Sequence, residues 1–187
     1  METRVSGGIA SLSVLLLVLL SQSVVSRAGF ATTVPVSAAT ATSVAGSLFP
    51  VSLAVGTRNV FMTDPEVVYI DDRRVGLQLR FQAYENTPEA GIAISETGRA
   101  LISGEVGYDG RAKQILLYEA KVDRLDFDAE TDLTRQLRSE ILAAWQANLT
   151  NPIRAELPPH PFILPFKEGI QDVSYEKRSI FIQVYYP

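Results

Sequence analysis

The stretch VGLQLRFQAY, residues 75–84, alternates apolar and polar side chains without a break. In an extended chain its apolar side chains would share one face: Val75, Leu77, Leu79, Phe81 and Ala83. Successive side chains of a strand point to opposite sides, so this alternation predicts an antiparallel strand with one buried face.

The same alternation returns in residues 99–109 and 114–127. The Asp109-Gly110 pair between these two segments is a strong hairpin signal. Shorter strands are expected at residues 57–62 and 67–70. Several strands run to about ten residues, roughly twice the usual length, and long antiparallel strands twist and coil strongly. We therefore expect a strongly curved antiparallel sheet.

Residues 132–149 interrupt the pattern of strands. Their apolar side chains recur at a spacing of four, at Leu133, Leu137, Ile141, Trp145 and Leu149. This spacing predicts an amphipathic helix, which Asn151-Pro152 would end, because the residue before a proline disfavours helical backbone. A proline-containing extended segment follows, and residues 162–175 and 180–186 are expected to form a closing hairpin.

The order of strands, one long helix and further strands predicts an α+β domain. In the expected arrangement, a long, strongly curved antiparallel β-sheet wraps around one long amphipathic α-helix and ends with a C-terminal hairpin. The wrapping would bury the apolar face of the sheet and that of the helix together. This single domain is expected to span residues 48–187.

The first 28 residues have the three parts of a secretory signal. Arg4 supplies a positive charge, residues 9–20 form an apolar core, and Ser26-Arg27-Ala28 places small residues before a cut. The core is shorter than the roughly 20 residues of a membrane span. We expect cleavage after Ala28 and a periplasmic or secreted protein, the alternative being a membrane-anchored form with an uncleaved signal. Residues 29–47, mostly Ala, Thr, Ser, Val and Gly, are expected to form a flexible tether.

Composition excludes several classes of site. The chain has no cysteine, so disulfides and thiolate metal sites are excluded. The formal net charge is −4, and nucleic-acid binders instead carry a basic face. We therefore predict no nucleic-acid partner, and membrane contact only if the signal is uncleaved.

Catalytic and metal-binding groups are sparse. His160 is the only histidine, and nothing beside it in the sequence is suited to orient it, so a loop histidine on the surface is favoured over a general base. The carboxylates Asp123, Asp126 and Asp128 lack the glycine turn and the final glutamate of a calcium loop. The interpretation is therefore a non-enzyme with no cofactor and no metal.

Two runs of sequence carry a family resemblance. Residues 98–109, GRALISGEVGYD, lead into residues 115–122, ILLYEAKV, and the expected long helix, extended segment and hairpin follow. This pattern, over residues 49–186, resembles the YceB-like family of small bacterial periplasmic proteins. The resemblance implies a domain of unknown function with a fold like that of the tubular lipid-binding (BPI-like) proteins. Many members are lipoproteins anchored through a cysteine, which this chain lacks.

A sheet wrapped around a helix can leave an apolar groove between them. Close packing is the competing expectation, because protein interiors rarely leave voids. The residues predicted to line the groove are Leu77, Leu79, Phe81, Ile102, Val106, Ile141 and Trp145. The leading hypothesis is a non-catalytic periplasmic binding protein for lipid or another apolar small molecule. The alternative is a ligand-free scaffold or interaction module of the cell envelope, with a protein partner.

Overall fold

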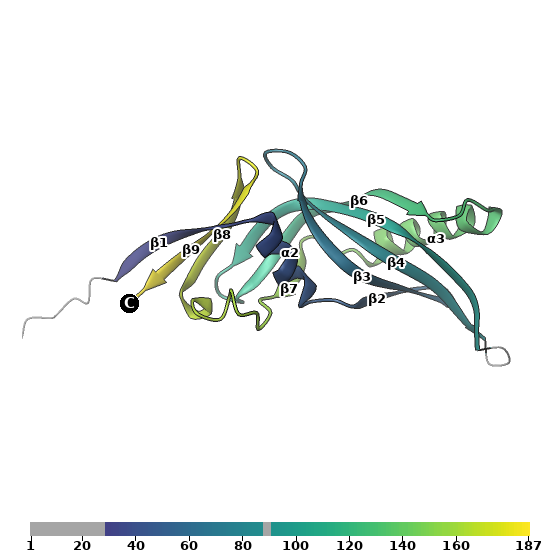
Figure 1. Ribbon diagram of the computed structural model, residues 1–187, viewed down its shortest axis with the longest axis horizontal. Coiled ribbons are helices and arrows are strands. Elements are labelled where there is room, and N and C mark those ends of the chain that lie inside the picture. The colour runs from purple at the N-terminus through teal and green to yellow at the C-terminus, as the bar shows by residue number, and fades with distance from the viewer. Residues whose placement is uncertain (1–28, 88–90) are drawn as a thin grey trace, which may run out of the picture. The chain divides into compact units, whose positions relative to one another are not determined.

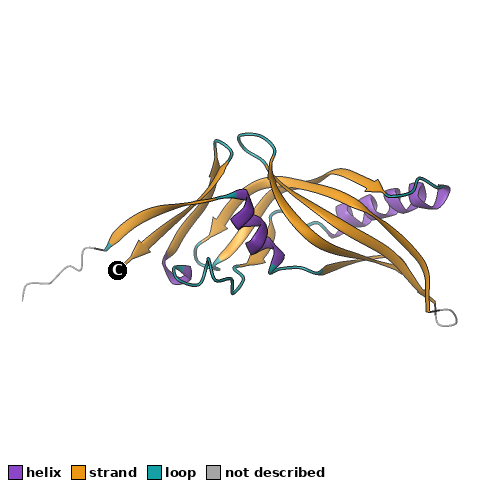
Figure 2. Ribbon diagram, viewed as in Figure 1, coloured by secondary structure: helices purple, strands orange, loops and turns teal. Residues whose placement is uncertain are grey.

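The computed structural model describes residues 29–87 and 91–187. Residues 31–186 form one compact unit, and strands dominate its described part (Figures 1 and 2). The elements in chain order are β1 (Phe30–Val36), α2 (Ala38–Gly46), β2 (Val51–Val55), β3 (Arg58–Tyr69), β4 (Val75–Thr87), β5 (Gly91–Asp109), β6 (Gln114–Phe127), α3 (Asp132–Asn148), β7 (Ile153–Glu156), the short 3-10 helix η1 (Lys167–Gly169), β8 (Ile170–Glu176) and β9 (Ser179–Tyr186).

The larger sheet is a six-stranded antiparallel meander in the order β2-β3-β4-β5-β6-β7. It curls into a half-barrel, as Figure 2 shows. The strand register shifts in the β3–β4 pair between Thr63 and Glu66, and twice in the β5–β6 pair, where the extra residues lie on β6. Such bulges bend a strand and increase its twist, which helps the sheet to curl.

The predicted fold class is wrong, although a helix forms where it was expected. Helix α3 lies at one end of the curled sheet and packs against β2 and β6, and the sheet does not wrap around it. Length explains the difference. The 17 residues of α3 extend about 25 Å, whereas the 19 residues of β5 follow a path of roughly 60 Å. One helix of this size can cover only part of such a sheet.

The segment expected to be a flexible tether is folded. Residues 30–36 form β1 and residues 38–46 form α2, so the folded part begins well before residue 48. Although the segment is poor in large apolar residues, Val36 and Val44 are buried. Two hydrogen bonds to β3 hold it: Val67 N–H donates to Thr42 Oγ1 at 2.9 Å, and Tyr69 Oη donates to Val36 O at 2.9 Å.

A smaller sheet has the order β1-β9-β8. Its β8–β9 hairpin corresponds to the expected closing hairpin, but the first strand is shorter, because residues 162–169 form turns and η1 instead. The two sheets contact each other between β5 and β8, and tyrosines of β3 and β8 also meet. The rings of Tyr69 and Tyr175 lie 5.4 Å apart, and Tyr175 Oη donates to Asp71 O at 2.7 Å.

The predicted secretory signal, residues 1–28, lies outside the described residues. Its cleavage and the location of the protein therefore stay predictions. Within residues 29–87 and 91–187, no helix combines the length and apolar character that crossing a membrane requires.

Buried apolar side chains form two separate clusters. We call the first the α3-end core: Val55, Val60, Leu79, Phe81, Ala83, Ala100, Ile102, Leu125, Phe127, Leu137 and Ile141. The second, the α2-end core, consists of Val36, Val44, Leu157, Ile163, Ile170, Val173, Ile182 and Val184. Each cluster lies under its own helix, so the curled sheet has two ends that pack against different elements.

Candidate functional site

An apolar cavity of about 210 Å³ lies at the α2 end of the unit. It has three walls: α2, the inner face of the curled sheet, and the segment from Leu157 to Ile163 together with β8 and β9. The side chains around it are almost entirely apolar, and the cavity is partly open to solvent. Because protein interiors are normally packed to the density of organic crystals, a void of this size is a distinctive feature of this end.

Small side chains account for the space. Helix α2 presents Ala41 and Ala45 to the cavity, and β7 presents Ala155. At the other end, α3 presents Leu137 and Ile141, which fill the corresponding volume. The walls of the cavity lose dispersion contacts that a close-packed core would make.

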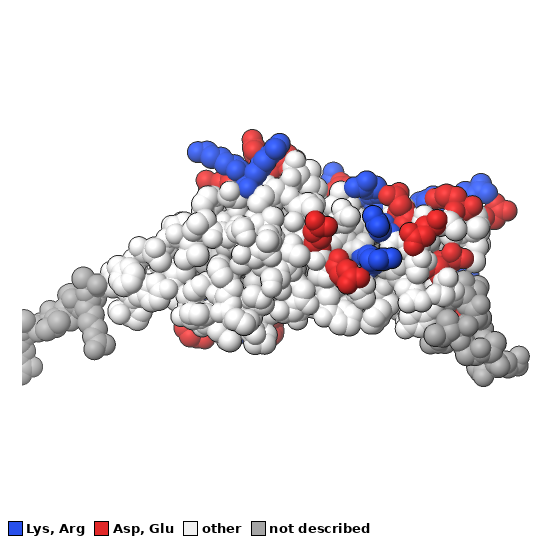
Figure 3. Space-filling view, in the orientation of Figure 1, with Lys and Arg blue, Asp and Glu red and all other residues white. Residues whose placement is uncertain are grey.

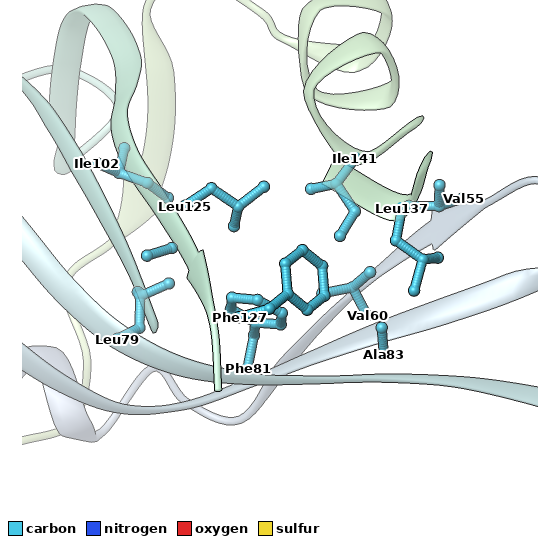
Figure 4. Packing of buried hydrophobic residues seen from close by; sticks show 11 residues of the cluster. Val55, Val60, Leu79, Phe81, Ala83, Ile102, Leu125, Phe127, Leu137 and Ile141 are labelled. Carbon is cyan, nitrogen blue, oxygen red and sulfur yellow. The ribbon is translucent and has the colours of Figure 1, made fainter. Parts of the chain in front are cut away.

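The structure divides the seven residues predicted to line a groove. Leu77, Ile102 and Val106 line the cavity, although Ile102 also belongs to the α3-end core and Leu77 packs against it. The other four, which are Leu79, Phe81, Ile141 and Trp145, belong to or pack against the α3-end core. Figure 4 shows Phe81 and Ile141 directed into this core together with Leu137.

Most of the side chains expected to line a groove beneath α3 are packed against one another. Phe81 and Phe127 meet edge to face with ring centroids 5.1 Å apart, and Leu79, Phe81 and Leu137 are each at most 3% exposed. Trp145 lies beside a different, smaller pocket of about 180 Å³, with Leu53 and Leu149. Helix α3 fills the space over Phe81 and Leu79, whereas the larger and more apolar cavity lies at the α2 end.

Sequence reasoning missed two walls of the cavity. One is α2, which lies in the segment that was expected to be a tether. The other is the segment LPPHPFIL, residues 157–164, which has no regular period. Its apolar side chains Leu157, Phe162 and Ile163 were a signal that this segment packs against something.

His160 has two hydrogen-bond partners, contrary to the expectation that nothing orients it. Phe162 N–H donates to His160 Nδ1 at 3.1 Å, so Nδ1 is an acceptor and carries no proton. The proton of the neutral ring then lies on Nε2, which donates to Ser43 Oγ at 3.0 Å. Ser43 lies on α2, 117 positions earlier in the chain, which is why the sequence did not indicate the pair.

The Ser43–His160 pair has the wrong polarity for nucleophilic catalysis. A histidine that activates serine needs a free Nε2 to accept the hydroxyl proton, with an acceptor on Nδ1 to hold the ring. Here the backbone donor at Nδ1 places the proton on Nε2, so Nε2 cannot accept another. The pair therefore joins two walls of the cavity without forming a catalytic dyad.

A second, polar cleft of about 610 Å³ lies beside the β5–β6 turn. Its cations are largely paired, Lys113 with Glu168 and Arg154 with Asp109. The N–H of Ala112, then that of Arg111 and the Arg154 guanidinium, hold the pKa of Asp109 below its ordinary value. These groups satisfy one another, so we find no geometry in this cleft that requires a ligand.

The aspartates considered for calcium have separate partners. Asp123 pairs with Lys121 at 3.0 Å, Asp126 pairs with Arg124 at 3.7 Å, and Asp128 accepts a hydrogen bond from the Thr97 hydroxyl. In residues 29–87 and 91–187, no three His, Cys, Asp or Glu side chains come together in a way that could hold a metal ion.

Comparison with known proteins adds no family. No protein-family model matches the chain. A search of curated proteins finds no match either. The resemblance to the YceB-like family therefore rests on the sequence pattern alone.

Proposed function

We propose that this protein binds a small apolar ligand, or the end of a lipid acyl chain, in the cavity beneath α2. The observation that carries the proposal is a void of about 210 Å³ with almost no polar lining. Polar voids hold ordered water, whereas apolar ones stay dry and accept apolar guests, and an engineered cavity of about 150 Å³ in another protein binds benzene.

The volume limits the kind of ligand. Pockets for drug-sized molecules usually measure about 300–1,000 Å³, so 210 Å³ would hold a smaller molecule or one part of a longer one. The partial opening of the cavity leaves room for the rest of a longer ligand outside. Each Å² of apolar surface removed from water contributes about 25 cal/mol, so affinity should rise with the apolar area buried.

Two further parts of the proposal come from the sequence. Export through a signal cleaved after Ala28 would place the protein in the periplasm or outside the cell, and an uncleaved signal would anchor it in a membrane. A non-catalytic role agrees with the polarity of the Ser43–His160 pair.

A pair of alanine substitutions on α2 tests the proposal. Ala45 faces the cavity and Ala39 is exposed on the same helix. We expect the folded chain to bind the neutral fluorescent probe N-phenyl-1-naphthylamine, with straight-chain fatty acids displacing it. Ala45→Leu should weaken probe binding at least about tenfold, because the leucine occupies the site, and Ala39→Leu should leave it unchanged. Titration by fluorescence gives the Kd values.

The proposal is wrong if the wild-type chain fails to bind any of a series of graded apolar probes. Binding that survives Ala45→Leu would place the ligand elsewhere. Because Trp145 lies at the α3 end, its fluorescence is not expected to report on the cavity.

One observation favours the alternative, an interaction module. Strand β1 is the outer strand of the smaller sheet, and residues 30–36 carry no charge. In Figure 3, the face over β1 and β9 shows few charged side chains. Edge strands are usually protected by charge or proline, and here Pro35 is the single such residue. Photocrosslinking from Thr33 that traps one protein in cells, with no apolar ligand bound, would support this alternative.

A further inference from the structure

Two walls of the cavity depend on tertiary contacts for their structure. Helix α2, AATATSVAG, has nine residues, fewer than the roughly 12–15 that an isolated helix needs. Three of those residues, two threonines and a valine, are poor helix formers because their side chains branch at Cβ. The facing segment, residues 157–166, has one-turn hydrogen bonds but no long helix or strand.

His160 is the polar link between these walls. Its Nε2 bonds to Ser43 on α2, and its Nδ1 accepts from Phe162 N–H within its own segment. Phe162 and the adjacent Ile163 line the cavity from one side, and Val44, next to Ser43, lines it from the other. A change at the imidazole therefore acts on both walls.

Protonation changes this link in a defined way. Histidine takes up a proton between about pH 5 and 8. The new proton would go to Nδ1, the nitrogen that carries no proton and accepts from the N–H of Phe162. Two donors would then point at each other, and Phe162 N–H would lose its acceptor. The ring would have to turn away, which also breaks the bond to Ser43.

Few charged groups lie near His160 in the sequence or in its hydrogen-bond network. Helix α2 contains no charged residue, and residues 157–166 contain no titratable side chain besides His160. Lys167, the next charged residue, donates to Leu157 O at 3.4 Å, and Glu66 of β3 adjoins Val67, which bonds to Thr42. His160 forms no ion pair with any described residue that would hold an imidazolium.

We propose that His160 is a pH-dependent latch on the apolar cavity, closed when the imidazole is neutral and released when it is protonated. The ligand-release part of this inference rests on the proposed binding function. The latch holds α2 against residues 157–166 at neutral pH. Acidification frees both walls, so the cavity loses its shape and its ligand.

The first experiment needs no ligand. Amide hydrogen exchange, corrected for the intrinsic pH dependence of exchange, is measured at pH 7.5 and 5.5 for the wild type, His160→Asn and His160→Ala. Asparagine can accept the Phe162 N–H in an Asx turn and does not titrate, so it is the matched control. We expect protection in α2 and at Phe162 to fall about tenfold in the wild type at pH 5.5, to stay constant in His160→Asn, and to be low at both pH values in His160→Ala.

The second experiment measures the N-phenyl-1-naphthylamine Kd of the same proteins. Linkage to one proton predicts a Kd about tenfold higher at pH 5.5 than at pH 7.5 in the wild type, and no change in His160→Asn. Because His160 is the only histidine, no other imidazole can produce this change. Equal protection of the wild type at both pH values overturns the latch. A pH-dependent loss of protection without probe binding at either pH keeps the latch and rejects the proposed function.

Discussion

The two ends of the curled sheet use the same strands but pack in different ways. At the α3 end, Leu137 and Ile141 reach the sheet, where Phe81 and Phe127 meet them, and the core is filled. At the α2 end, Ala41 and Ala45 face the same sheet and about 210 Å³ stays empty. We infer that the small side chains of α2 contribute to the empty space, because the larger ones of α3 reach into a packed core.

The empty end has an energetic cost. Enclosed cavities in another protein destabilise it by about 24 cal/mol per Å³, so a closed void of this size would cost roughly 5 kcal/mol. The partial opening makes that figure an upper bound. Folded proteins are typically stable by only about 5–15 kcal/mol, so even part of this upper bound would matter, and a bound ligand would recover some of it.

The largest expected effect tests the filled end. Leu137→Ala should lower the free energy of unfolding by about 3–5 kcal/mol and leave probe affinity unchanged, since Leu137 is 1% exposed and does not line the cavity. Ile163→Ala at the cavity should cost less, about 2–3 kcal/mol, because part of that side chain already faces empty space. Urea denaturation gives both values. Equal losses of unfolding free energy in the two variants would contradict the claim that the two ends differ in packing.

A smaller effect is expected at the helix caps. Ser37 Oγ accepts from Thr40 N–H at 3.1 Å, and Thr131 Oγ1 accepts from Thr134 N–H at 3.1 Å, so Ala at either position should cost about 1 kcal/mol. Ser37→Ala should also raise the Kd of the probe, because α2 is a wall of the cavity, whereas Thr131→Ala should leave this Kd unchanged. Ser37→Asp, which keeps a capping oxygen, serves as the control. An effect of Thr131→Ala on probe binding would contradict the separation of the two ends.

The smallest effect concerns acid stability at the cavity end. Asp109 accepts the N–H groups of Arg111 and Ala112, each at 3.0 Å, and its pKa is lowered in the folded protein. A depressed pKa contributes stability above the unfolded value of about 3.9, and this stability is lost as pH falls through the folded value. Asp109→Asn keeps an acceptor for both N–H groups but removes the charge, so thermal melts between pH 6 and 2 should show a slightly weaker pH dependence. If the melting temperature of the variant depended more strongly on pH, the expected contribution of the lowered Asp109 pKa would be contradicted.

Local patterns predicted the long strands β4 to β6 and helix α3, but β3 was expected as two short strands, and β1, β2 and β7 were missed. Alternation located β4 and β6 and most of β5, and the spacing of four located α3 to within one residue. These elements bury a regular face, so their period appears in the sequence. By contrast, α2 buries only Val44 among small side chains, and it depends on contacts with β3 and with His160. Nothing local indicates such contacts.

The position of the cavity could not be predicted for a similar reason. The pattern of β4 shows that Leu77, Leu79 and Phe81 share a face, but it does not show which helix each of them meets. Leu77 packs against the α3-end core and also lines the void, while Phe81 lies within that core. That distinction depends on the lengths of the sheet and the helix. The contact between Ser43 and His160 could not be predicted either, because these residues lie 117 positions apart in the chain.

Strand β5 has a consequence for how the molecule melts. Its residues contribute Ala100 to the α3-end core and Val106 to the cavity wall, and it pairs with both β4 and β6 along most of its length. Neither end is therefore an autonomous folding unit, because β5 contributes residues to both. Unfolding of the middle of β5 would therefore disrupt the α3-end core and the cavity wall in one cooperative step. Local unfolding of α2 alone would leave the α3-end core folded.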